Sequence, residues 1–409
     1  MTANLAAPSC GYRGSAGALL QRLEKESIQY FVDNQLGHGL ILDRQRNFAR
    51  RGKTGLCSIS ATGMGLIALA LAGEPEFAVL SRRESRKRIA RALRTALTLR
   101  HINGMMPHFV DSRSLAPVGS DAISTIDSAW LLAGALWAAE FTGVPQIRRL
   151  VRALVARVNW NAWTNGAPAP LLRHGASVSG TYLTSVWDRF NAETAFMYLL
   201  AIGADETKAL PASSWNALEL FTGTLGSRTF ISSDLGLFTF QYSHLLLDGA
   251  KLPPVKGKNL LAESIEGTLA NREFCAALRE QYRTFQTFWG VSAGDGPPNH
   301  PSGPDEYRAY DPQSVDGTSH IEATVASLEV APEHVLANLM NAEEPQWKRL
   351  HGRYGYSNVN VDRNFVSRDV VGIDVGAALF ALDNTLHNGR VRKVFMRVQP
   401  VRRALHRLR

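Results

Sequence analysis

The amino-acid sequence predicts an all-helical protein whose helices pair into a ring, with the connecting loops gathered at one end. Two observations predict this fold. Segments with apolar residues at about i, i+3, i+4 and i+7 recur along the 409 residues, and this spacing indicates amphipathic helices. The connections between them are long and rich in glycine, proline, asparagine and aromatic residues, whereas the alternation typical of strands is scarce. A ring of helical hairpins explains both features and gives the loops a common cleft.

Local signals support the ends of several predicted helices. Ser58 and Ser124 each precede an apolar helix, where the hydroxyl can accept a hydrogen bond from a free backbone N–H. Gly73 and Gly143 follow apolar helices as C-terminal stops, and Pro332 stands at a first helical position. The predicted helices are residues 16–34, 58–72, 81–100, 124–142, 146–158, 190–202, 212–224, 260–285, 321–328, 332–340, 374–387 and 391–408.

The connections set the expected organisation of the chain. Short extended pieces are expected at residues 229–232 and 238–241. Because no low-complexity linker divides the chain and no internal repeat aligns, we expect one domain over residues 1–409. The long aromatic-bearing loops are predicted at residues 101–123, 159–188, 225–248, 288–319 and 352–372.

Composition and charge bound the class of protein. Hydrophobic residues make up 45% of the chain, yet no apolar run reaches membrane-spanning length, so we expect a soluble protein without a membrane partner. The net charge of +9 is concentrated at residues 82–94 and in a basic helical tail at about residues 390–409. Both runs interleave apolar residues at helical spacing, which favours solvated helix faces over a nucleic-acid site. The start of the chain shows no secretory pattern, so we expect a cytoplasmic location, or a periplasmic one if a signal was removed.

Several familiar chemistries are not predicted. The spacing of Cys10, Cys57 and Cys275 fits neither a zinc site nor a disulfide framework. The phosphate-binding glycine loop, the metal-binding His-Glu-x-x-His helix and the Gly-x-Ser-x-Gly nucleophile turn are missing from the sequence. We assign Gly63-Met64-Gly65 to close helix packing or turns, and we expect neither a metal nor a cofactor.

Two carboxylates at helix starts are the candidate catalytic residues. Asp127 opens an otherwise apolar helix, where the helix dipole stabilises the anion. Glu193 belongs to the stretch from Asp188 to Glu193 that begins a very apolar predicted helix, and partial burial there raises the pKa of a carboxyl, as a general acid requires. The alternative for Asp127 is an ordinary charge in the first turn of a helix, and the alternative for Glu193 is a salt bridge to Arg189 or another arginine.

Aromatic, amide and acidic residues in the loops are candidates for substrate binding. Sugars present apolar ring faces and hydroxyl groups, so flat rings beside carboxylates and amides suit them. The alternatives are a buried aromatic segment for residues 238–248 and ordinary Asp-Gly turns for two of the acids. The candidates are Trp187, Asp188, Phe238, Gln241, Tyr242, His244, Trp289, Asp295, Asp316 and Asp374.

Together, these segments resemble the bacterial glycoamylase-like domain family, which is related to the endo-β-1,2-glucanases of glycoside hydrolase family 144. They also resemble the transglycosylating domain of cyclic β-1,2-glucan synthases. The resemblance runs from about residue 58 to residue 396, and the order and spacing of its pieces make it specific. The matching stretches are Ser60-Ala61-Thr62-Gly63-Met64-Gly65-Leu66; Ser124-Thr125-Ile126-Asp127 with Leu131-Leu132-Ala133-Gly134; Trp187-Asp188 with Glu193; Leu237-Phe238-Thr239 and Gln241-Tyr242-Ser243-His244; Trp289-Gly290 with Asp295-Gly296-Pro297; Asp316-Gly317-Thr318; Tyr354-Gly355; and Gly372-Ile373-Asp374-Val375-Gly376.

The resemblance implies an (α/α)6 barrel without a cofactor, with catalytic acids at the start of two inner helices. Those positions fall on Asp127 and Glu193. The chain also departs from the pattern of the glucanases. Ser124 stands where the glucanases have an additional acid, Asp127 where they usually have glutamate, and Phe240 where they have histidine. In the late motif, Val375 stands in place of glutamine, and Asp383-Asn384 stands in place of Glu-Asn.

We therefore expect a glycoside hydrolase or transglycosylase that acts on a β-linked glucan, with β-1,2-glucan first. Glu193 would protonate the leaving oxygen, directly or through a substrate hydroxyl, and Asp127 would position water or stabilise the transition state. A carboxyl separation of about 6.5–9.5 Å would predict inversion, and one of about 5–5.5 Å retention. Two alternatives are a catalytically altered carbohydrate-binding protein of the same fold and a binder of nucleic acid or anionic glycan. The oligomeric state is left open.

Overall fold

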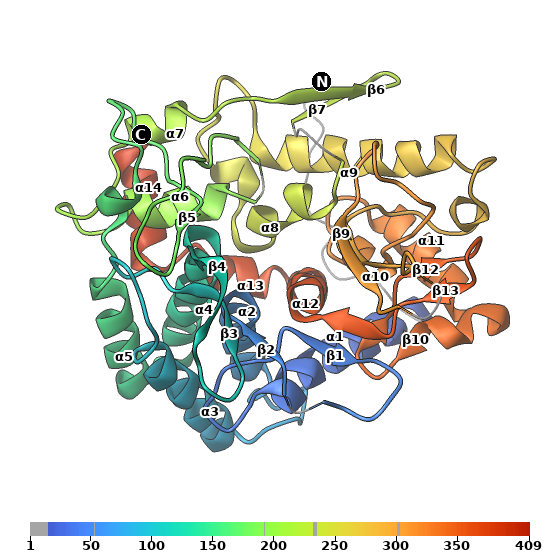
Figure 1. The fold of residues 1–409 in the computed structure, drawn as a ribbon, viewed down its shortest axis with the longest axis horizontal. Helices are drawn as coiled ribbons and strands as arrows, with labels where there is room; N and C mark the ends of the chain where they lie inside the picture. Colours follow the sequence, from blue (N-terminus) through green and yellow to red (C-terminus); the bar gives the residue numbers. More distant parts are fainter. Residues whose placement is uncertain (1–14, 53, 192, 232–234, 301–302) are drawn as a thin grey trace.

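The structure is a computed structural model that describes residues 15–409 except residues 53, 192, 232–234 and 301–302. Helices form most of its regular structure, and Figure 1 shows them arranged around the end-on helix α12 (Gly372–Leu386). The prediction of a mainly helical fold is confirmed. The described residues contain no helix that is both long and apolar enough to cross a membrane.

Helices buried on all sides alternate along the chain with helices that expose one face. All described residues of α2 (Ile59–Leu71), α6 (Ala195–Ile202) and α10 (Ile321–Val325) are buried, as are most residues of α4 (Thr125–Thr142), α8 (Phe238–Leu246) and α12. The intervening longer helices are α1 (Ser15–Asn34), α3 (Arg82–Ala96), α5 (Pro145–Ala156), α9 (Leu260–Ala277) and α11 (Pro332–Glu343). Such an alternation of inner and outer helices defines a helical toroid.

The inner helices pack on one another in sequence order. Helix α2 packs on α4, α4 on α6 and α6 on α8, while α12 contacts α2, α8 and α10. Glycine allows the closest of these approaches, because a Cβ at Gly134 would lie 1.8 Å from the backbone oxygen of Gly63. A Cβ at Gly63 would lie 2.3 Å from the backbone oxygen of Trp130. The packing role expected for Gly63-Met64-Gly65 is confirmed.

Short helices complete the chain. The α-helices α7 (Ser213–Asn216), α13 (Arg390–Phe395) and α14 (Gln399–Arg407) are accompanied by the 3-10 helices η1 (Trp160–Trp163), η2 (Gly249–Lys251), η3 (Arg283–Gln286) and η4 (Pro345–Leu350). One hydrophobic core draws on side chains from Leu19 to Ala404.

Small antiparallel sheets occupy the connections between the helices. The largest has the order β2-β3-β4-β5, formed by β2 (Leu56–Ser58), β3 (Pro107–Asp111), β4 (Pro117–Ser124) and β5 (Gly175–Ala176). The two-stranded sheets pair β1 (Arg44–Arg46) with β14 (Asp369–Val371), β6 (Thr222–Leu225) with β7 (Arg228–Ile231), β8 (Ala293–Gly296) with β9 (Glu306–Ala309), β10 (His351–Gly352) with β11 (Gly355–Tyr356), and β12 (Val359–Asn360) with β13 (Phe365–Val366).

Strands deliver the chain directly to the N-termini of three inner helices. Strand β2 leads into α2, β4 into α4 and β14 into α12. The predicted caps are confirmed, since the Ser58 hydroxyl accepts from the N–H of Ala61 and the Ser124 hydroxyl from the N–H of Asp127. Gly143 ends α4 with a φ of 64°, which suits glycine. These junctions hold the starts of α2, α4 and α12 in defined positions.

Several predicted elements differ from the structure. The predicted helix at residues 190–202 begins only at Ala195, and the one at 260–285 ends at Ala277. The predicted helix at 212–224 shortens to Ser213–Asn216, and its last three residues instead belong to β6, which pairs with β7. The predicted loop at 101–123 contains β3 and most of β4, which pair with each other and, on their outer edges, with the distant strands β2 and β5.

Two further differences have local causes. Residues 238–241, expected to be extended, form the first turn of α8, because α8 is buried on nearly all sides and lacks the polar face that identifies an amphipathic helix. The predicted helix at 391–408 is divided into α13 and α14, since Pro400 has no N–H and is tolerated only in a first helical turn. The extended piece predicted at 229–232 agrees with β7 as far as Ile231, and Ser232 lies outside the described residues.

Candidate functional site

Acidic residues stand at the starts of several inner helices. Asp127 lies in the first turn of α4, Glu322 in that of α10 and Asp374 in that of α12. Glu193 lies two residues before α6. A helix N-terminus carries partial positive charge, which by itself favours the ionised form of a nearby acid, whereas burial opposes it.

Tyr242 of α8 connects four of the predicted site residues. Its side chain is buried, with 7% exposed. Burial raises its pKa well above the ordinary value, and the charges of Asp374, Glu193 and Asp127 raise it further. The charges of three acids, two in the first turns of α4 and α12 and one just before α6, therefore act on one phenol.

Asp127 is held as a buried anion. Its carboxylate is bounded by Ser60, whose hydroxyl donates to Oδ1 at 2.5 Å, and by His108, whose Nδ1 lies 2.9 Å from Oδ2. Burial opposes ionisation, but the hydrogen bond and charge of His108 and the hydroxyls of Ser124 and Ser60 lower the pKa of Asp127 below its ordinary value. Only 6% of the Asp127 side chain is exposed, whereas 45% of the His108 side chain is exposed.

Asp374 has the opposite electrostatic environment. Burial raises its pKa to about 8, and the neighbouring negative charges of Asp295 and Asp43 contribute in the same direction. At neutral pH this carboxyl is therefore protonated and can donate a proton. A carboxyl kept neutral and a carboxylate kept ionised in the same region are the combination used for general acid–base chemistry at sugars.

Arg44 connects Asp295 to this region. Its Nη1 lies 2.9 Å from both carboxylate oxygens of Asp295, and its Nε lies 3.3 Å from Asp43. Burial raises the pKa values of both acids, and the positive charge of Arg44 opposes that effect. The predicted residue Asp295 is thus neutralised by an arginine, while Asp374 nearby is not paired with any cation among the described residues.

Three aromatic side chains border this group. Trp187 is half-buried and donates from Nε1 to the Thr125 hydroxyl at the start of α4. Phe238 lies at the start of α8 with its ring centroid 5.8 Å from that of Tyr242. Tyr307 of β9 is 46% exposed and lies near Arg44 and Asp374. Trp187 and Phe238 were predicted, and Tyr307 adds a third flat surface of the kind on which a sugar ring stacks.

Gln241 and His244, two predicted residues of α8, do not direct their polar atoms toward these acids. The amide of Gln241 donates to the backbone oxygen of Ala323 and to the Ser327 hydroxyl, so it joins α8 to α10. His244 lies in the last turn of α8, roughly 9 Å further along the helix axis than Phe238 at 1.5 Å per residue. It is 3% exposed beside Arg392 and Glu329, which corrects its placement at the cleft end.

Three other predicted residues make contacts within the protein that do not require a substrate. Trp289 is 8% exposed and donates to the backbone oxygen of His334, so its ring is not an open surface. Asp316 accepts from the N–H and hydroxyl of Thr318 across a turn in which Gly317 has a φ of 86°, the Asp-Gly turn that was the alternative. Asp188 is half-exposed with Arg189 at 3.7 Å.

Sequence reasoning missed His108, Ser60, Arg44 and Tyr307. His108 and Tyr307 lie in predicted loops, and Ser60 and Arg44 stand in segments without a catalytic pattern. The only signal near any of them was the stretch from Ser60 to Leu66 in the family resemblance. Their roles depend on partners far away in the sequence.

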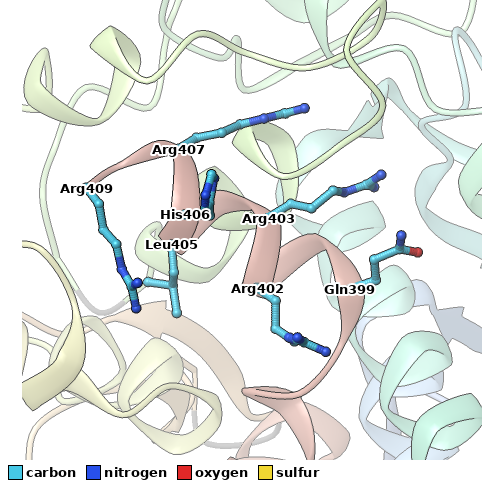
Figure 2. A pocket seen from close by; sticks show the side chains of 7 residues that line it. All are labelled: Gln399, Arg402, Arg403, Leu405, His406, Arg407 and Arg409. Carbon is cyan, nitrogen blue, oxygen red and sulfur yellow. The ribbon is translucent and has the colours of Figure 1, made fainter.

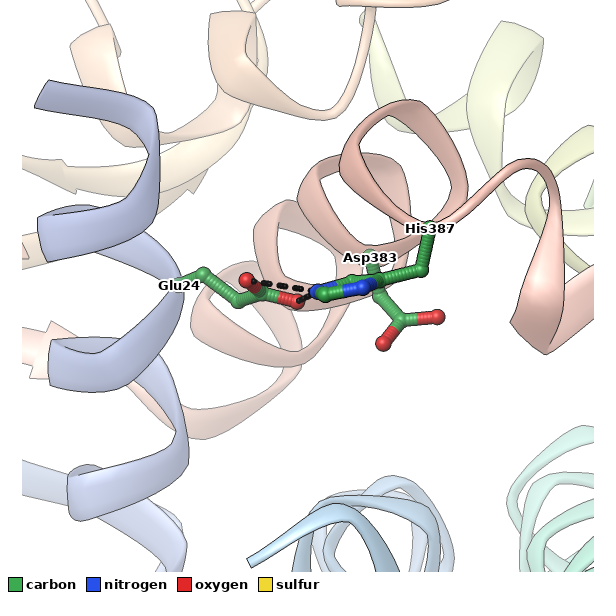
Figure 3. A group of neighbouring side chains, drawn as sticks. All are labelled: Glu24, Asp383 and His387. Carbon is green, nitrogen blue, oxygen red and sulfur yellow. Dashed lines mark hydrogen bonds and ion pairs between the residues drawn. The ribbon is translucent and has the colours of Figure 1, made fainter. Parts of the chain in front are cut away.

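One cluster among the described residues has the composition of a metal site. Glu24 of α1 lies beside Asp383 and His387 of α12 (Figure 3). Both carboxylates of this cluster already have a basic partner. His387 lies 3.2 Å from Glu24, and Arg390 binds Asp383 with Nε and Nη2. Arg390 also reaches Glu76 at 2.6 Å. We therefore interpret it as an ion-pair network that joins α1, α12 and α13.

The basic C-terminal tail forms a separate hollow. Figure 2 shows that its side chains spread from α14, and the hollow has a volume of about 680 Å³. The lining residues are Gln399, Arg402, Arg403, Leu405, His406, Arg407 and Arg409. Among the described residues no aspartate or glutamate lines it, so it does not fit acid–base chemistry at a glycosidic bond. The apolar side chains Val394, Val398 and Val401 are buried, as expected of an amphipathic tail.

The helical toroid and the acids at its inner helix starts define a class of protein. Residues 184–399 match the model of the Glycoamylase family, described as "Putative glucoamylase". This match covers more than half of the chain, and the chain therefore belongs to that family. The resemblance identified in the sequence is confirmed. No curated protein sequence matches the chain.

Solved structures share the fold over nearly the whole chain. A Bacteroides uniformis protein with the same description has a TM-score of 0.84 and 20% identity over 97% of this chain and 98% of its own. The endo-β-1,2-glucanase from Chitinophaga pinensis, in complex with sophorotriose and glucose, has a TM-score of 0.82 and 19% identity over 97% of this chain and 98% of its own. The β-1,2-glucanase from Parabacteroides distasonis has a TM-score of 0.83 and 19% identity over 98% of this chain but only 61% of its own.

Proposed function

We propose that this protein is a glycoside hydrolase or transglycosylase that acts on a β-linked glucan, with β-1,2-glucan as the first candidate. The observation that carries the proposal is the pair of acids with opposite pKa shifts, Asp127 and Asp374, arranged around Tyr242. Membership of the Glycoamylase family and the shared fold with β-1,2-glucanases support it. The exposed ring of Tyr307 and the half-buried ring of Trp187 suit a sugar ligand.

We further propose that the toroid is an (α/α)6 barrel and that the chain is one domain. The six inner helices of the barrel would be α2, α4, α6, α8, α10 and α12. One large hydrophobic core from Leu19 to Ala404, beside a small second cluster that includes Phe230 and Phe240, supports one domain. The starts of the inner helices would then open onto one cleft, into which the strands deliver Asp127 and Asp374.

Two residues compete for the role of proton donor. Glu193 is half-buried at the entrance of α6 and was assigned this role from the sequence. Asp374 is protonated at neutral pH because its pKa is raised to about 8. We retain Glu193 as the proposed general acid and name Asp374 as the carboxyl that replaces it if Glu193 is dispensable. Asp127 supplies the anion of the pair.

A product screen tests the function. The wild type is incubated with β-1,2-, β-1,3- and β-1,4-glucans, and the products are separated by thin-layer chromatography beside Glu193→Gln, Asp374→Asn and Asp127→Asn. We expect short β-1,2-linked products from the wild type and a loss of about 100-fold or more for the variant that lacks the proton donor. Unchanged turnover in Glu193→Gln would remove Glu193 from the mechanism. Binding without any product would instead support a carbohydrate-binding protein.

A further inference from the structure

In the pair formed by Asp127 and His108, the histidine is exposed and the predicted catalytic acid is buried. Asp127, the acid predicted to act on the substrate, has a side chain that is 6% exposed, whereas the side chain of His108 is 45% exposed. Oδ1 of Asp127 accepts a hydrogen bond from Ser60, and Oδ2 is buried with Nδ1 of His108 2.9 Å away. A substrate therefore has access to the imidazole rather than to the carboxylate.

We propose that Asp127 acts through His108, so that the imidazole is the group that meets the sugar and takes a proton, and Asp127 is a positioning residue. This inference rests on the proposed function. It assigns to the buried acid the task of orienting a base, which is a different task from contacting the reacting atoms.

The backbone around His108 supports the proposal independently. The antiparallel register of β3 and β4 pairs Pro107 with Ile123 but Phe109 with Val118, so the register shifts at His108. Irregularities of this kind bend a strand and re-aim a side chain, and they are over-represented beside active sites. The His108 ring also packs on Phe109, with ring centroids 3.8 Å apart. The strand thus presents the imidazole to Asp127 in a fixed orientation.

Electrostatics indicate which ring nitrogen carries the proton. An ionised Asp127 beside Nδ1 favours the proton on Nδ1 and leaves Nε2 as an acceptor. Burial lowers the pKa of His108, but the hydrogen bond and charge of Asp127 and the charge of Asp43 raise it above its ordinary value. Asp127 on α4 and Asp43 before β1 are the charged groups that act on this imidazole. Both favour the imidazolium that forms when Nε2 takes a proton.

In the hydrolytic step, each bond that forms is matched by one that breaks. Nε2 of neutral His108 takes a proton from water while the water oxygen forms a bond to the anomeric carbon. The glycosidic C–O bond breaks, and the leaving oxygen takes a proton from the acidic carboxyl. The imidazolium afterwards releases its proton to solvent, and the carboxylate regains one.

Activity measurements on the full chain test the role of His108. We expect His108→Ala to lower kcat on β-1,2-glucan by about 100-fold or more, with partial rescue by added imidazole, because the small side chain leaves room for the missing base. His406→Ala, which removes an exposed histidine of α14, is the control and should retain wild-type kcat. Thermal unfolding of each variant confirms that it is folded. A kcat for His108→Ala within threefold of the wild type, with Asp127→Asn strongly impaired, would overturn the proposal.

An NMR titration separates failure of this proposal from failure of the proposed function. The His108 imidazole signal, assigned by its loss in His108→Ala, is followed against pH in the wild type and in Asp127→Asn. We expect the pKa to fall in Asp127→Asn and the signal to shift when a β-1,2-linked glucose trisaccharide is added. If the wild type turns over none of the glucans, the proposed function fails, and the titration alone decides this proposal. The proposal for His108 would be refuted by an imidazole pKa that is the same in Asp127→Asn as in the wild type. It would also be refuted by an imidazole signal that does not shift when the trisaccharide is added.

Discussion

Arg44 binds Asp295 through both carboxylate oxygens at 2.9 Å, while Asp374 lies close to that pair without a cation of its own among the described residues. The arginine therefore compensates one acid and leaves the other to be neutralised by a proton. This difference explains why burial raises the pKa of Asp374 to about 8.

The raised pKa of Asp374 predicts a change of stability with pH. Between its ordinary pKa of 3.8 and about 8, the folded protein holds a proton that the unfolded chain has released. The free energy of unfolding therefore falls as the pH rises through this window. Asp374→Asn is neutral at every pH, so its gain in Tm over the wild type should grow from pH 4 to pH 8. Thermal unfolding at several pH values measures this gain, and a constant difference would contradict the prediction.

Close packing of α2 on α4 predicts a severe effect of one methyl group. Gly134→Ala would place its Cβ 1.8 Å from the backbone oxygen of Gly63, and neither backbone can move without shifting its helix. We expect a loss of about 1–3 kcal/mol or more in the free energy of unfolding, measured in urea. Gly37→Ala is the matched control, because a Cβ there meets no atom within 4 Å. Equal stabilities of the two variants would show that the helices are not in contact as described.

The buried ion pair of Asp383 predicts a strong dependence on Arg390. Asp383 is completely buried, and Arg390 is its cationic partner. Arg390→Ala would leave an uncompensated buried charge, which costs about 3–5 kcal/mol. The double variant Asp383→Leu with Arg390→Met should recover most of this loss, because it removes both charges together. Urea unfolding measures each variant, with Arg402→Ala on the exposed face of α14 as the control.

The exposed ring of Tyr307 predicts an effect on binding rather than on folding. Because 46% of the residue is exposed, Tyr307→Ala should leave Tm nearly unchanged. If the ring stacks on a sugar of the substrate, KM for β-1,2-glucan should rise several-fold with a smaller change in kcat. Met340→Ala, which truncates a residue of α11 that is 41% exposed, should change neither constant. A Tyr307→Ala variant with wild-type KM would remove Tyr307 from the binding surface.

The described cysteines predict the pattern of thiol reactivity. Cys57 and Cys275 are both buried and free, and burial raises the pKa of each thiol to about 12. Thiolates, not thiols, are the reactive species. In a Cys10→Ser variant, a thiol reagent should therefore label no cysteine before denaturation and two after it. Labelling of the native variant would show that one of these sites opens to solvent.

Much of the site could be located from the sequence because its acids stand at helix starts. Asp127 and Glu193 were predicted as acids at the entrances of apolar segments, and Asp374 and Tyr242 as residues in the family pattern. His244 was misplaced for the opposite reason, since it belongs to the same stretch as Phe238 but lies at the far end of α8. Sequence proximity places residues on one helix without stating which end of the toroid they occupy.

Periodicity and capping by themselves determined that the chain is mainly helical, where most of its long helices lie, and the serine caps at Ser58 and Ser124. Such features depend on neighbours within a few residues or on the apolar face of a single helix. Only the tertiary structure decided that Asp127 is buried behind His108 and that Asp374 lacks the arginine that Asp295 has. The reason is physical: the charge state of a carboxyl depends on the burial and on the partners that distant segments bring to it.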